Sequence, residues 1–441
     1  MRTRTTLAST ALISTGVVLG WLAFGRVNLN QQVAGDLASL PVSAAQNGFT
    51  PEEVARIHAA WEWQDIFKTG DASLYAFLHF SEFYPSTLVR RSEPTVALER
   101  DADANIATVR IKSELGEMSL GEYLVNANSR AQGMVVVYRG KIVFEKYPGM
   151  RDHDTHLIMS VGKTMVNLVV ALLETDGKID VRHTIGSYVP ALRDTAWAGI
   201  KVIDVLDMAS GLDVGESVES RSNATSAFGR FVRATLNVPG PDGKLEKHTD
   251  VIRSAKKLRG PGPTFEYSSM NTQVLVLLAE AVEHRPWAEI FQERVWSKLN
   301  AEGDLLVAVT PDGIAMPCGL IAARLRDLAR FGMLYTPSWS RAARDRVVSA
   351  DMVNQIQAGA SAGRKASVSE GGVPVTNSRQ WDAVRANGDF FKKGLHGQGL
   401  YVSPGKDLVI AWFSTAASTD ILWYACAIAN SYEAGGDSKR P

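Results

Sequence analysis

The hydrophobic pattern of the chain is clearest from Gly133 onward. Residues 134–138 form an apolar run of the kind found in strands, Arg139-Gly140 provides a tight turn, and residues 141–147 resume the run. Two such runs joined by two turn residues predict a β-hairpin.

A strongly apolar helix is predicted after the hairpin. We expect it to begin near Ser160, to run through Leu173 and to end at Gly177, because glycine readily adopts the left-handed conformation that closes a helix. Further helical patterns occupy residues 202–209, 272–283, 287–299 and 322–335. The later pattern predicts strands over 399–402 and 408–414 around Pro404-Gly405, whereas residues 422–429 fit a strand or a terminal helix.

Strands near both ends of this region, with a long helical middle, predict an α+β domain over residues 131–432. Its antiparallel sheet should join the two ends of the fold. Residues 51–130 are an N-terminal extension that opens with a helix over 51–67, where Thr50 and Glu53 have capping-box spacing. The polar residues 433–441 are expected to form a flexible tail.

The amino terminus resembles an export signal or a membrane anchor. Arg2 and Arg4 precede an uncharged, apolar stretch over 5–25, about as long as the ~20 residues of a spanning helix. A signal core has only about 7 to 15 residues, which favours an uncleaved anchor; cleavage after Gly25 and a buried helix are the alternatives. With both arginines inside, the rest of the chain is expected in the periplasm or outside the cell. Residues 26–50 form a linker.

Composition and charge exclude several classes of function. Lys plus Arg and Asp plus Glu each total 47, so the basic excess of a nucleic-acid-binding protein is missing. Cys318 and Cys426 are too few for a zinc cage or a disulfide scaffold. We expect both as small buried apolar residues, and whether they pair stays open. No cofactor is predicted, and the oligomeric state is undetermined.

Candidate chemistry centres on a Ser-x-x-Lys motif, which matches the chain three times. Ser160 and Lys163 form one match, residues 254–257 the second and residues 403–406 the third. The third contains a Pro-Gly turn, and the second lies in a basic, polar stretch. Only Ser160 opens a long apolar helix that could hold a nucleophile rigidly.

The helical position gives Ser160 and Lys163 a chemical relationship. Residues three apart share a helix face, so the lysine amine can approach the serine hydroxyl. Burial lowers the pKa of an amine and allows it to act as a base. The unpaired N–H groups at a helix start can stabilise a developing oxyanion. On the motif alone, a capping serine beside a solvated lysine is the favoured interpretation.

Five later segments resemble motifs of the β-lactamase-related serine hydrolases. This family includes class C β-lactamases, D-amino-acid peptidases, carboxylesterases and 6-aminohexanoate-dimer hydrolases. Residues 205–212 are similar to its LLTHTSGL block and residues 261–271 to its PGTxFxYSN block. Residues 312–315 and 326–332 resemble a later helix, and 396–402 with Pro404 resemble the closing glycine-rich strand. The resemblance implies a β-lactamase/transpeptidase-like fold, with helices flanking the antiparallel sheet and a mostly helical second subdomain.

The same resemblance implies an ester or amide hydrolase with an acyl-enzyme intermediate. Ser160 would be the nucleophile, and Tyr267, its pKa lowered by Lys163, would carry the proton. The backbone N–H of Ser160 and one near Gln398 would hold the oxyanion. No cofactor is implied, and the expected partner is a small ester or amide.

Two departures from the family pattern bear on the substrate. Ser269 stands where class C β-lactamases have the asparagine of Tyr-x-Asn, and asparagine comes only at Asn271. The Lys-Thr-Gly motif is absent, and His396-Gly397-Gln398 is the closest counterpart. The lysine of that motif commonly binds a carboxylate of the substrate, so its absence favours neutral amides or esters as substrates.

Three other interpretations remain open. His153 and His156 could belong to a metal site, although they lack the His-Glu-x-x-His spacing of a helical zinc site. The domain could instead be a sensor that is acylated without turnover, or a non-catalytic cell-wall-binding module. A D-amino-acid peptidase or carboxypeptidase would keep the chemistry and change only the substrate.

Overall fold

The computed structural model describes residues 40–361, 368–370, 373–418 and 420–432. The predicted signal or anchor over 5–25 and the predicted tail over 433–441 lie outside these residues. Among the residues that are described, no helix is both long enough and apolar enough to cross a membrane.

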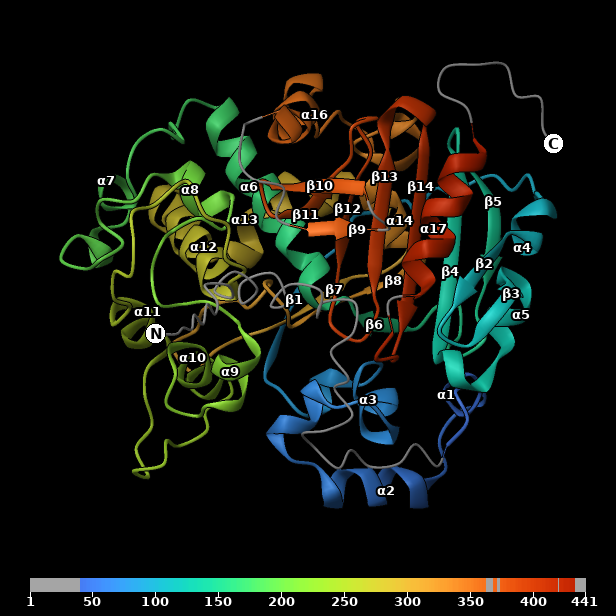
Figure 1. Cartoon of the computed structure of the whole chain (residues 1–441), viewed down its shortest axis with the longest axis horizontal. Coiled ribbons are helices and arrows are strands. Elements are labelled where there is room, and N and C mark those ends of the chain that lie inside the picture. The colour runs from blue at the N-terminus through green and yellow to red at the C-terminus, as the bar shows by residue number, and fades with distance from the viewer. Residues whose placement is uncertain (1–39, 362–367, 371–372, 419, 433–441) are drawn as a thin grey trace, which may run out of the picture. The chain divides into compact units, whose positions relative to one another are not determined.

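A large antiparallel sheet is the centre of the fold (Figure 1). Within the described residues it has eight strands in the order β5-β4-β14-β13-β12-β11-β10-β9. The strands are β4 (Ala131–Tyr138), β5 (Lys141–Lys146), β9 (Val368–Glu370), β10 (Val373–Ser378), β11 (Trp381–Val384), β12 (Phe390–Lys393), β13 (Gly399–Ser403) and β14 (Leu408–Ser414). The pairing of β4 with β14 confirms that the sheet joins the two ends of the predicted domain.

Alternation along β4 explains why this sheet is covered on both faces. Val135 and Val137 belong to the main hydrophobic core, whereas Met134, Val136 and Tyr138 belong to a second cluster. Successive side chains of a strand point to opposite faces, so an entirely apolar strand needs a cover on each. The two principal covers are α14 (Leu325–Met333), which packs on the main-core face, and α17 (Asp420–Ser431), whose apolar residues complete the second cluster (Figure 1).

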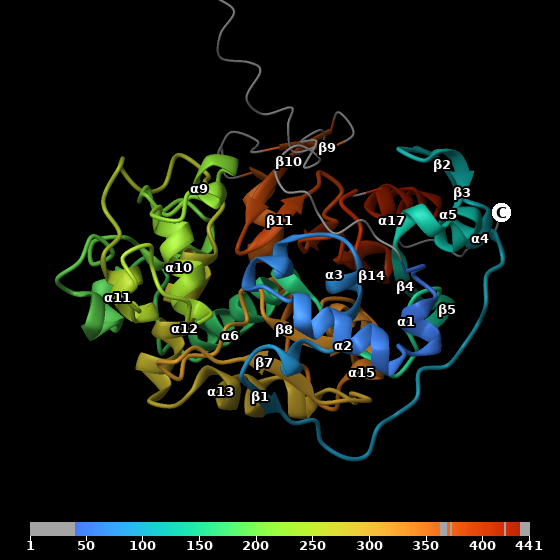
Figure 2. The same cartoon turned by 90° about the horizontal axis from the view of Figure 1, so that it is seen from below.

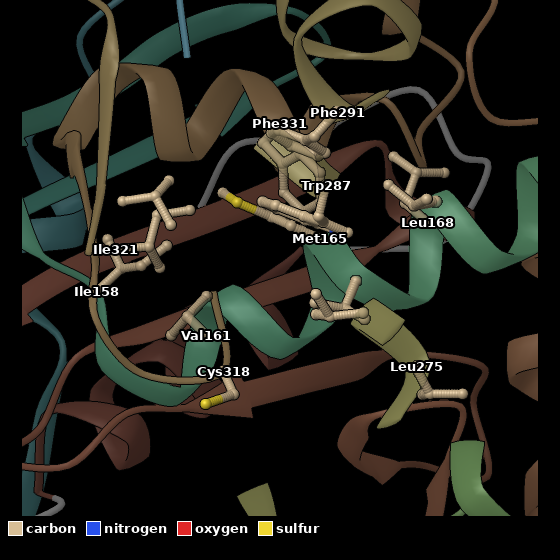
Figure 3. Close-up of a cluster of buried hydrophobic side chains, with 14 of the residues drawn as sticks. Ile158, Val161, Met165, Leu168, Leu275, Trp287, Phe291, Cys318, Ile321 and Phe331 are labelled. Carbon is tan, nitrogen blue, oxygen red and sulfur yellow. The ribbon is translucent and has the colours of Figure 1, made fainter. Parts of the chain in front are cut away.

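The helical part of the fold packs around α6 (Lys163–Thr175). Most of this helix is buried, and α12 (Ser269–Glu283) and α13 (Trp287–Arg294) pack against it. Figure 3 shows Val161, Met165 and Leu168 in one apolar cluster with Trp287 and Phe291. The remaining helices of this part are α7 (Ile185–Tyr188), α8 (Val202–Leu206), α9 (Val218–Ser222), α10 (Ala227–Thr235) and α11 (His248–Arg253).

A smaller antiparallel sheet leads into the apolar helix. Its strand order is β1-β7-β8-β6, with β1 (Ser86–Val89), β6 (Thr155–Leu157), β7 (Leu305–Ala308) and β8 (Ile321–Arg324). The helix predicted over 322–335 was therefore wrong at its start. Residues 322–324 pair with β6, and only from Leu325 does the chain become helical. Pairing with a strand more than 150 residues away overrode the local helical pattern.

The described residues of the N-terminal extension belong to the same compact unit as those of the predicted domain. Strand β1 pairs with β7, and the N–H of Leu157 donates to the carbonyl of Phe77 at 2.7 Å. Figure 2 shows α2 and α3 in this region. Its elements are α1 (Ala44–Asn47), α2 (Pro51–Ala60), α3 (Asp71–Ala76), α4 (Asn105–Thr108), β2 (Arg110–Ser113), β3 (Gly116–Ser119) and α5 (Leu120–Val125).

Most predicted elements are present, with changed ends. The capping box of Thr50 and Glu53 is confirmed, but α2 stops at Ala60, and a separate 3₁₀ turn covers Trp63–Phe67. The hairpin 134–147 and both later strands are confirmed, and 422–429 is helical, within α17. The described part of the linker forms α1 and buries Val42 and Ala45. Two further helices are α15 (Trp339–Ala342) and α16 (Ala350–Gln357).

Candidate active site

Ser160 lies in a 3₁₀ turn, Met159–Gly162, between β6 and α6, and its side chain is partly exposed. The preceding residue, Met159, has φ +49°, a left-handed conformation that is costly for a residue with a side chain. The N–H of Ile158 donates to the carbonyl of Ile321 at 2.9 Å, which fixes this turn to β8. The chain therefore holds Ser160 in a strained, rigid turn, as expected for a positioned nucleophile.

Lys163 is the first residue of α6, and its side chain is completely buried. Its Nζ lies 3.0 Å from Ser160 Oγ, 2.9 Å from Ser269 Oγ and 2.5 Å from the carbonyl oxygen of Cys318. Burial is the main cause of a lowered Lys163 pKa, which nearby Glu216 and Asp382 partly oppose. A neutral amine could donate to Cys318 and Ser269 and still accept the proton of Ser160.

Tyr267 precedes α12, and its ring lies close to the side-chain nitrogens of two lysines. Its ring centroid is 5.1 Å from the Nζ of Lys163 and 4.8 Å from the Nζ of Lys392, and its phenol hydrogen-bonds to Ser160. Burial raises the Tyr267 pKa above its usual value, although Lys392 opposes this shift. The expectation that Lys163 lowers this pKa was wrong: the opposing cation is Lys392, and burial outweighs it. The raised pKa keeps Tyr267 a neutral phenol at neutral pH.

Lys392 was missed in the sequence, where the closing motif was placed at residues 396–398. It lies on β12, is fully buried, and its Nζ contacts Asp382 Oδ1 on β11 at 2.5 Å. Residues 392–394 read Lys-Lys-Gly, one residue from the Lys-Thr-Gly pattern. A Cβ on Gly394 would lie 2.7 Å from the carbonyl oxygen of Ile158, so this strand end lies against the turn that carries Ser160.

The predicted residues His396, Gly397 and Gln398 form the turn between β12 and β13. His396 is buried, hydrogen-bonds to the backbone of Ile66, and has a pKa lowered to about 4 by burial. Gln398 Nε2 donates to the carbonyl of Ser414 at 2.5 Å. These contacts stabilise the turn. Of the four residues predicted as substrate or oxyanion contacts, Ser269 is the one whose side chain bonds Lys163.

Glu216 is a second site residue that the sequence pattern did not indicate. Its carboxylate is buried, accepts the backbone N–H of Ser269, and pairs with Arg221 Nη2 at 3.2 Å. The N–H of Glu216 also donates to the carbonyl of Tyr267 at 3.0 Å. Glu216 therefore fixes the start of α12, where Ser269 faces Lys163.

The two other Ser-x-x-Lys matches have structural roles. Ser254 caps the end of α11 and donates to the carbonyl of Val251. Ser403 donates to buried Asp389, and Lys406 Nζ bonds the carbonyl of Ala429. In neither match does the structure place the lysine amine against the serine hydroxyl.

The histidine pair considered as a metal site is divided between two environments. His153 is exposed beside Asp152, whereas His156 is buried, bonds Gln132 Oε1 at 2.8 Å and stacks on Phe413. Throughout the described part of the chain, no cluster of three or more His, Cys, Asp or Glu side chains is arranged to hold a metal ion. Cys318 is a buried free thiol, as expected, and its pKa is raised to about 11 by burial; Cys426 is half-buried.

A small cleft of about 100 Å³ opens beside Ser160. Its polar lining includes Ser160, Glu216, Arg221, Thr235 and Ser269, and the rest is largely apolar. Such a cleft, lined by Ser160 and with the buried Nζ of Lys163 3.0 Å from the Ser160 hydroxyl, has the shape and lining to admit a mainly apolar molecule.

Comparison with known proteins finds a family and several relatives. The family model described as Beta-lactamase matches residues 124–421. A 6-aminohexanoate-dimer hydrolase of Paenarthrobacter ureafaciens is 28% identical over 388 residues, which are 86% of this chain and 94% of the relative.

Solved structures with a similar fold agree with the family match. A Bacillus anthracis protein provisionally named a 6-aminohexanoate-dimer hydrolase has a TM-score of 0.68 at 22% identity, covering 81% of this chain and 93% of that one. EstA of Arthrobacter nitroguajacolicus has a TM-score of 0.52 at 14% identity, covering 76% and 98%. At these identities the structures support the β-lactamase/transpeptidase-like fold predicted from the sequence.

Proposed function

The chain belongs to the beta-lactamase family of hydrolases, and from this membership we propose that it cleaves an ester or amide through an acyl-enzyme on Ser160. One observation carries the proposal: the buried Nζ of Lys163 lies 3.0 Å from Ser160 Oγ. This contact would supply both a nucleophile and, in the buried lysine, a base with a lowered pKa.

The proposed reaction begins when Ser160 Oγ attacks the substrate carbonyl carbon and Lys163 Nζ takes the hydroxyl proton. The backbone N–H of Ser160 and one from the 394–398 turn, whose Leu395 lines the cleft, would stabilise the tetrahedral oxyanion. Tyr267, as a phenol, would protonate the leaving alcohol or amine as its bond to the carbonyl carbon breaks. Tyr267 would then recover its proton from the Lys163 ammonium. In the second half, water would attack the acyl carbonyl carbon while the neutral Lys163 takes a water proton. The bond from the carbonyl carbon to Oγ would break, the acid would leave, and Ser160 Oγ would regain its proton.

The substrate class follows from the relatives and from the electrostatics of the site. Lys392 contacts Asp382, so its ammonium is already neutralised by a carboxylate. This supports neutral esters or amides over substrates that need a free lysine for a carboxylate. The name 6-aminohexanoate-dimer hydrolase, carried by the curated relative, denotes cleavage of a linear amide. We include linear amides among the proposed substrates.

The test combines active-site labelling with turnover. A fluorophosphonate probe should label the wild-type protein at Ser160, and p-nitrophenyl butyrate should be hydrolysed. Ser160→Ala should lose both, whereas Ser254→Ala, at a second Ser-x-x-Lys match, should retain both. Wild-type hydrolysis by Ser160→Ala would refute the proposal. Labelling of Ser160 without turnover of any ester or amide would instead indicate an acylated sensor.

We also propose that the reaction takes place outside the cytoplasm. The support is the Arg-flanked apolar stretch over residues 5–25, which resembles a signal or an anchor. Fractionation of cells expressing the full chain should place it in the membrane or the periplasm. Recovery in the cytoplasmic fraction alone would refute this location.

A further inference from the structure

The cleft has a wall that the family match does not include. Ile66 and Phe67 line the cleft together with Ser160, yet both precede the matched residues 124–421. They belong to the 3₁₀ turn Trp63–Phe67 of the N-terminal extension. This extension therefore contributes directly to the space in which a substrate would lie.

The 3₁₀ turn is held firmly in place. Ile66 is 1% exposed, and its backbone hydrogen-bonds to buried His396 of the β12–β13 turn. Asp65 caps the turn by accepting the N–H of Glu62 at 2.8 Å, and it pairs with Lys68 at 2.6 Å. Phe67 is 38% exposed, although a large apolar residue usually has a buried side. A fixed backbone thus presents a partly solvated aromatic ring at the cleft.

Other apolar lining of the cleft comes from α10 and its end. Phe228, Phe231 and Val232 line it from this helix, and Leu236 follows at its carboxyl end. Glu216 and Arg221 are the charged side chains of the lining, and they pair with each other at 3.2 Å. Paired charges attract a charged substrate group less than a lone charge does, so the apolar surface should dominate recognition.

We propose that Phe67 is a specificity-determining residue, and that the cleft binds a linear aliphatic chain attached to the scissile carbonyl. This inference rests on the proposed function and names its substrate class: esters or amides of straight-chain acids of about four to eight carbons. The chain runs from the Ser160 acyl position along α10 and Leu236, and the Phe67 ring covers it. Each methylene removed from water there adds binding to the substrate and to the transition state.

The experiment measures kcat/KM on p-nitrophenyl esters from acetate to octanoate with the full-length protein. In the wild type, kcat/KM should rise about three- to four-fold per added methylene until the cleft is filled. Phe67→Ala should lower the hexanoate-to-acetate ratio of kcat/KM about ten-fold. Phe67→Leu, which keeps apolar contact, should retain most of the preference.

Leu88→Ala is the matched control, because Leu88 is 41% exposed on β1 and does not line the cleft. It should leave the ratio unchanged. An unchanged ratio in Phe67→Ala, or an equal fall in Leu88→Ala, overturns the inference. A flat chain-length profile in a wild type that hydrolyses esters overturns the inference alone. Absence of both Ser160 labelling and hydrolysis overturns the proposed function with it.

Discussion

The Nζ of Lys163 lies 3.0 Å from the Oγ of Ser160, and the same nitrogen contacts the carbonyl of Cys318 at 2.5 Å. The carbonyl can only accept, so it takes one of the amine hydrogens. Burial lowers the Lys163 pKa, which favours the neutral amine with a lone pair. The three partners of Lys163 therefore orient that lone pair toward the serine hydroxyl.

Lys163→Met should lower kcat for p-nitrophenyl butyrate by about 10²- to 10⁴-fold, the usual contribution of a general base. Methionine fills a similar volume without an unpaired charge, so the Tm should fall little. Steady-state kinetics and thermal melting measure the two effects. Lys257→Met, at a second Ser-x-x-Lys match, is the control and should keep wild-type kcat. A kcat within three-fold of wild type in Lys163→Met would exclude the base role.

Glu216→Gln should move the acidic limb of the kcat/KM pH profile to lower pH. The base is active when Lys163 is neutral, so activity is lost as pH falls through the Lys163 pKa. Glu216 opposes the lowering of that pKa, and its removal should lower the pKa further. Glutamine keeps an acceptor for the N–H of Ser269. A pH-rate series compares this variant with the control Glu219→Gln on the exposed helix α9, which should keep the wild-type profile. A shift of the acidic limb to higher pH in Glu216→Gln would contradict the role of Lys163 as the base.

Gly162→Ala should damage both stability and labelling. A Cβ at this position would lie 2.2 Å from the carbonyl oxygen of Pro317, just before the Cys318 carbonyl that holds Lys163. Relief of this clash must move the Ser160 turn or the 317–318 backbone. Overpacking of this kind should lower the free energy of unfolding by about 1–3 kcal/mol, and the Tm with it. We also expect fluorophosphonate labelling of Ser160 to be at least ten-fold slower. Gly199→Ala, with open space around the new Cβ, should match wild type.

The sequence predicted those parts of the fold in which the local pattern and the tertiary contacts agree. Strand β4 and most of α6 are buried and largely apolar, so the need to bury them favours the predicted elements. The helix predicted from residue 322 failed because Ala322 and Ala323 pair with β6, a contact that no local window contains. The 51–67 helix was predicted too long, since a short 3₁₀ turn after α2 has no periodicity of its own.

The candidate site was predictable only where residues are close in sequence or carry a motif. Ser160 and Lys163 are three apart, and Tyr267 and Ser269 lie in one block. Glu216, Asp382 and the Cys318 carbonyl come from separate elements and are brought together by tertiary folding alone. Lys392 did have a signal, because Lys-Lys-Gly at 392–394 differs by one residue from the expected Lys-Thr-Gly.

The buried pair of Lys392 and Asp382 supports a last prediction, on stability. Lys392→Met leaves the Asp382 carboxylate without the ammonium 2.5 Å away, with 19% of its side chain exposed. Loss of one partner should lower the free energy of unfolding by about 2–4 kcal/mol. This is somewhat less than for a fully buried pair, because Asp382 is partly exposed. Asp382→Asn combined with Lys392→Met removes both charges and should recover about half of the loss, because an apolar replacement of a buried pair is often nearly neutral.

Urea unfolding of the wild type, both single variants and the double variant gives the coupling energy of the pair. A coupling of at least 1 kcal/mol is expected. Lys392→Met should also change the pH dependence of catalysis. Lys392 opposes the raised pKa of Tyr267, so its removal should raise that pKa further and keep the phenol protonated to higher pH. Any limb of the pH profile due to phenol ionisation should therefore move upward. Strictly additive unfolding energies would show that Lys392 does not pair with Asp382 in solution. A downward shift of that limb would show that Lys392 does not lower the Tyr267 pKa.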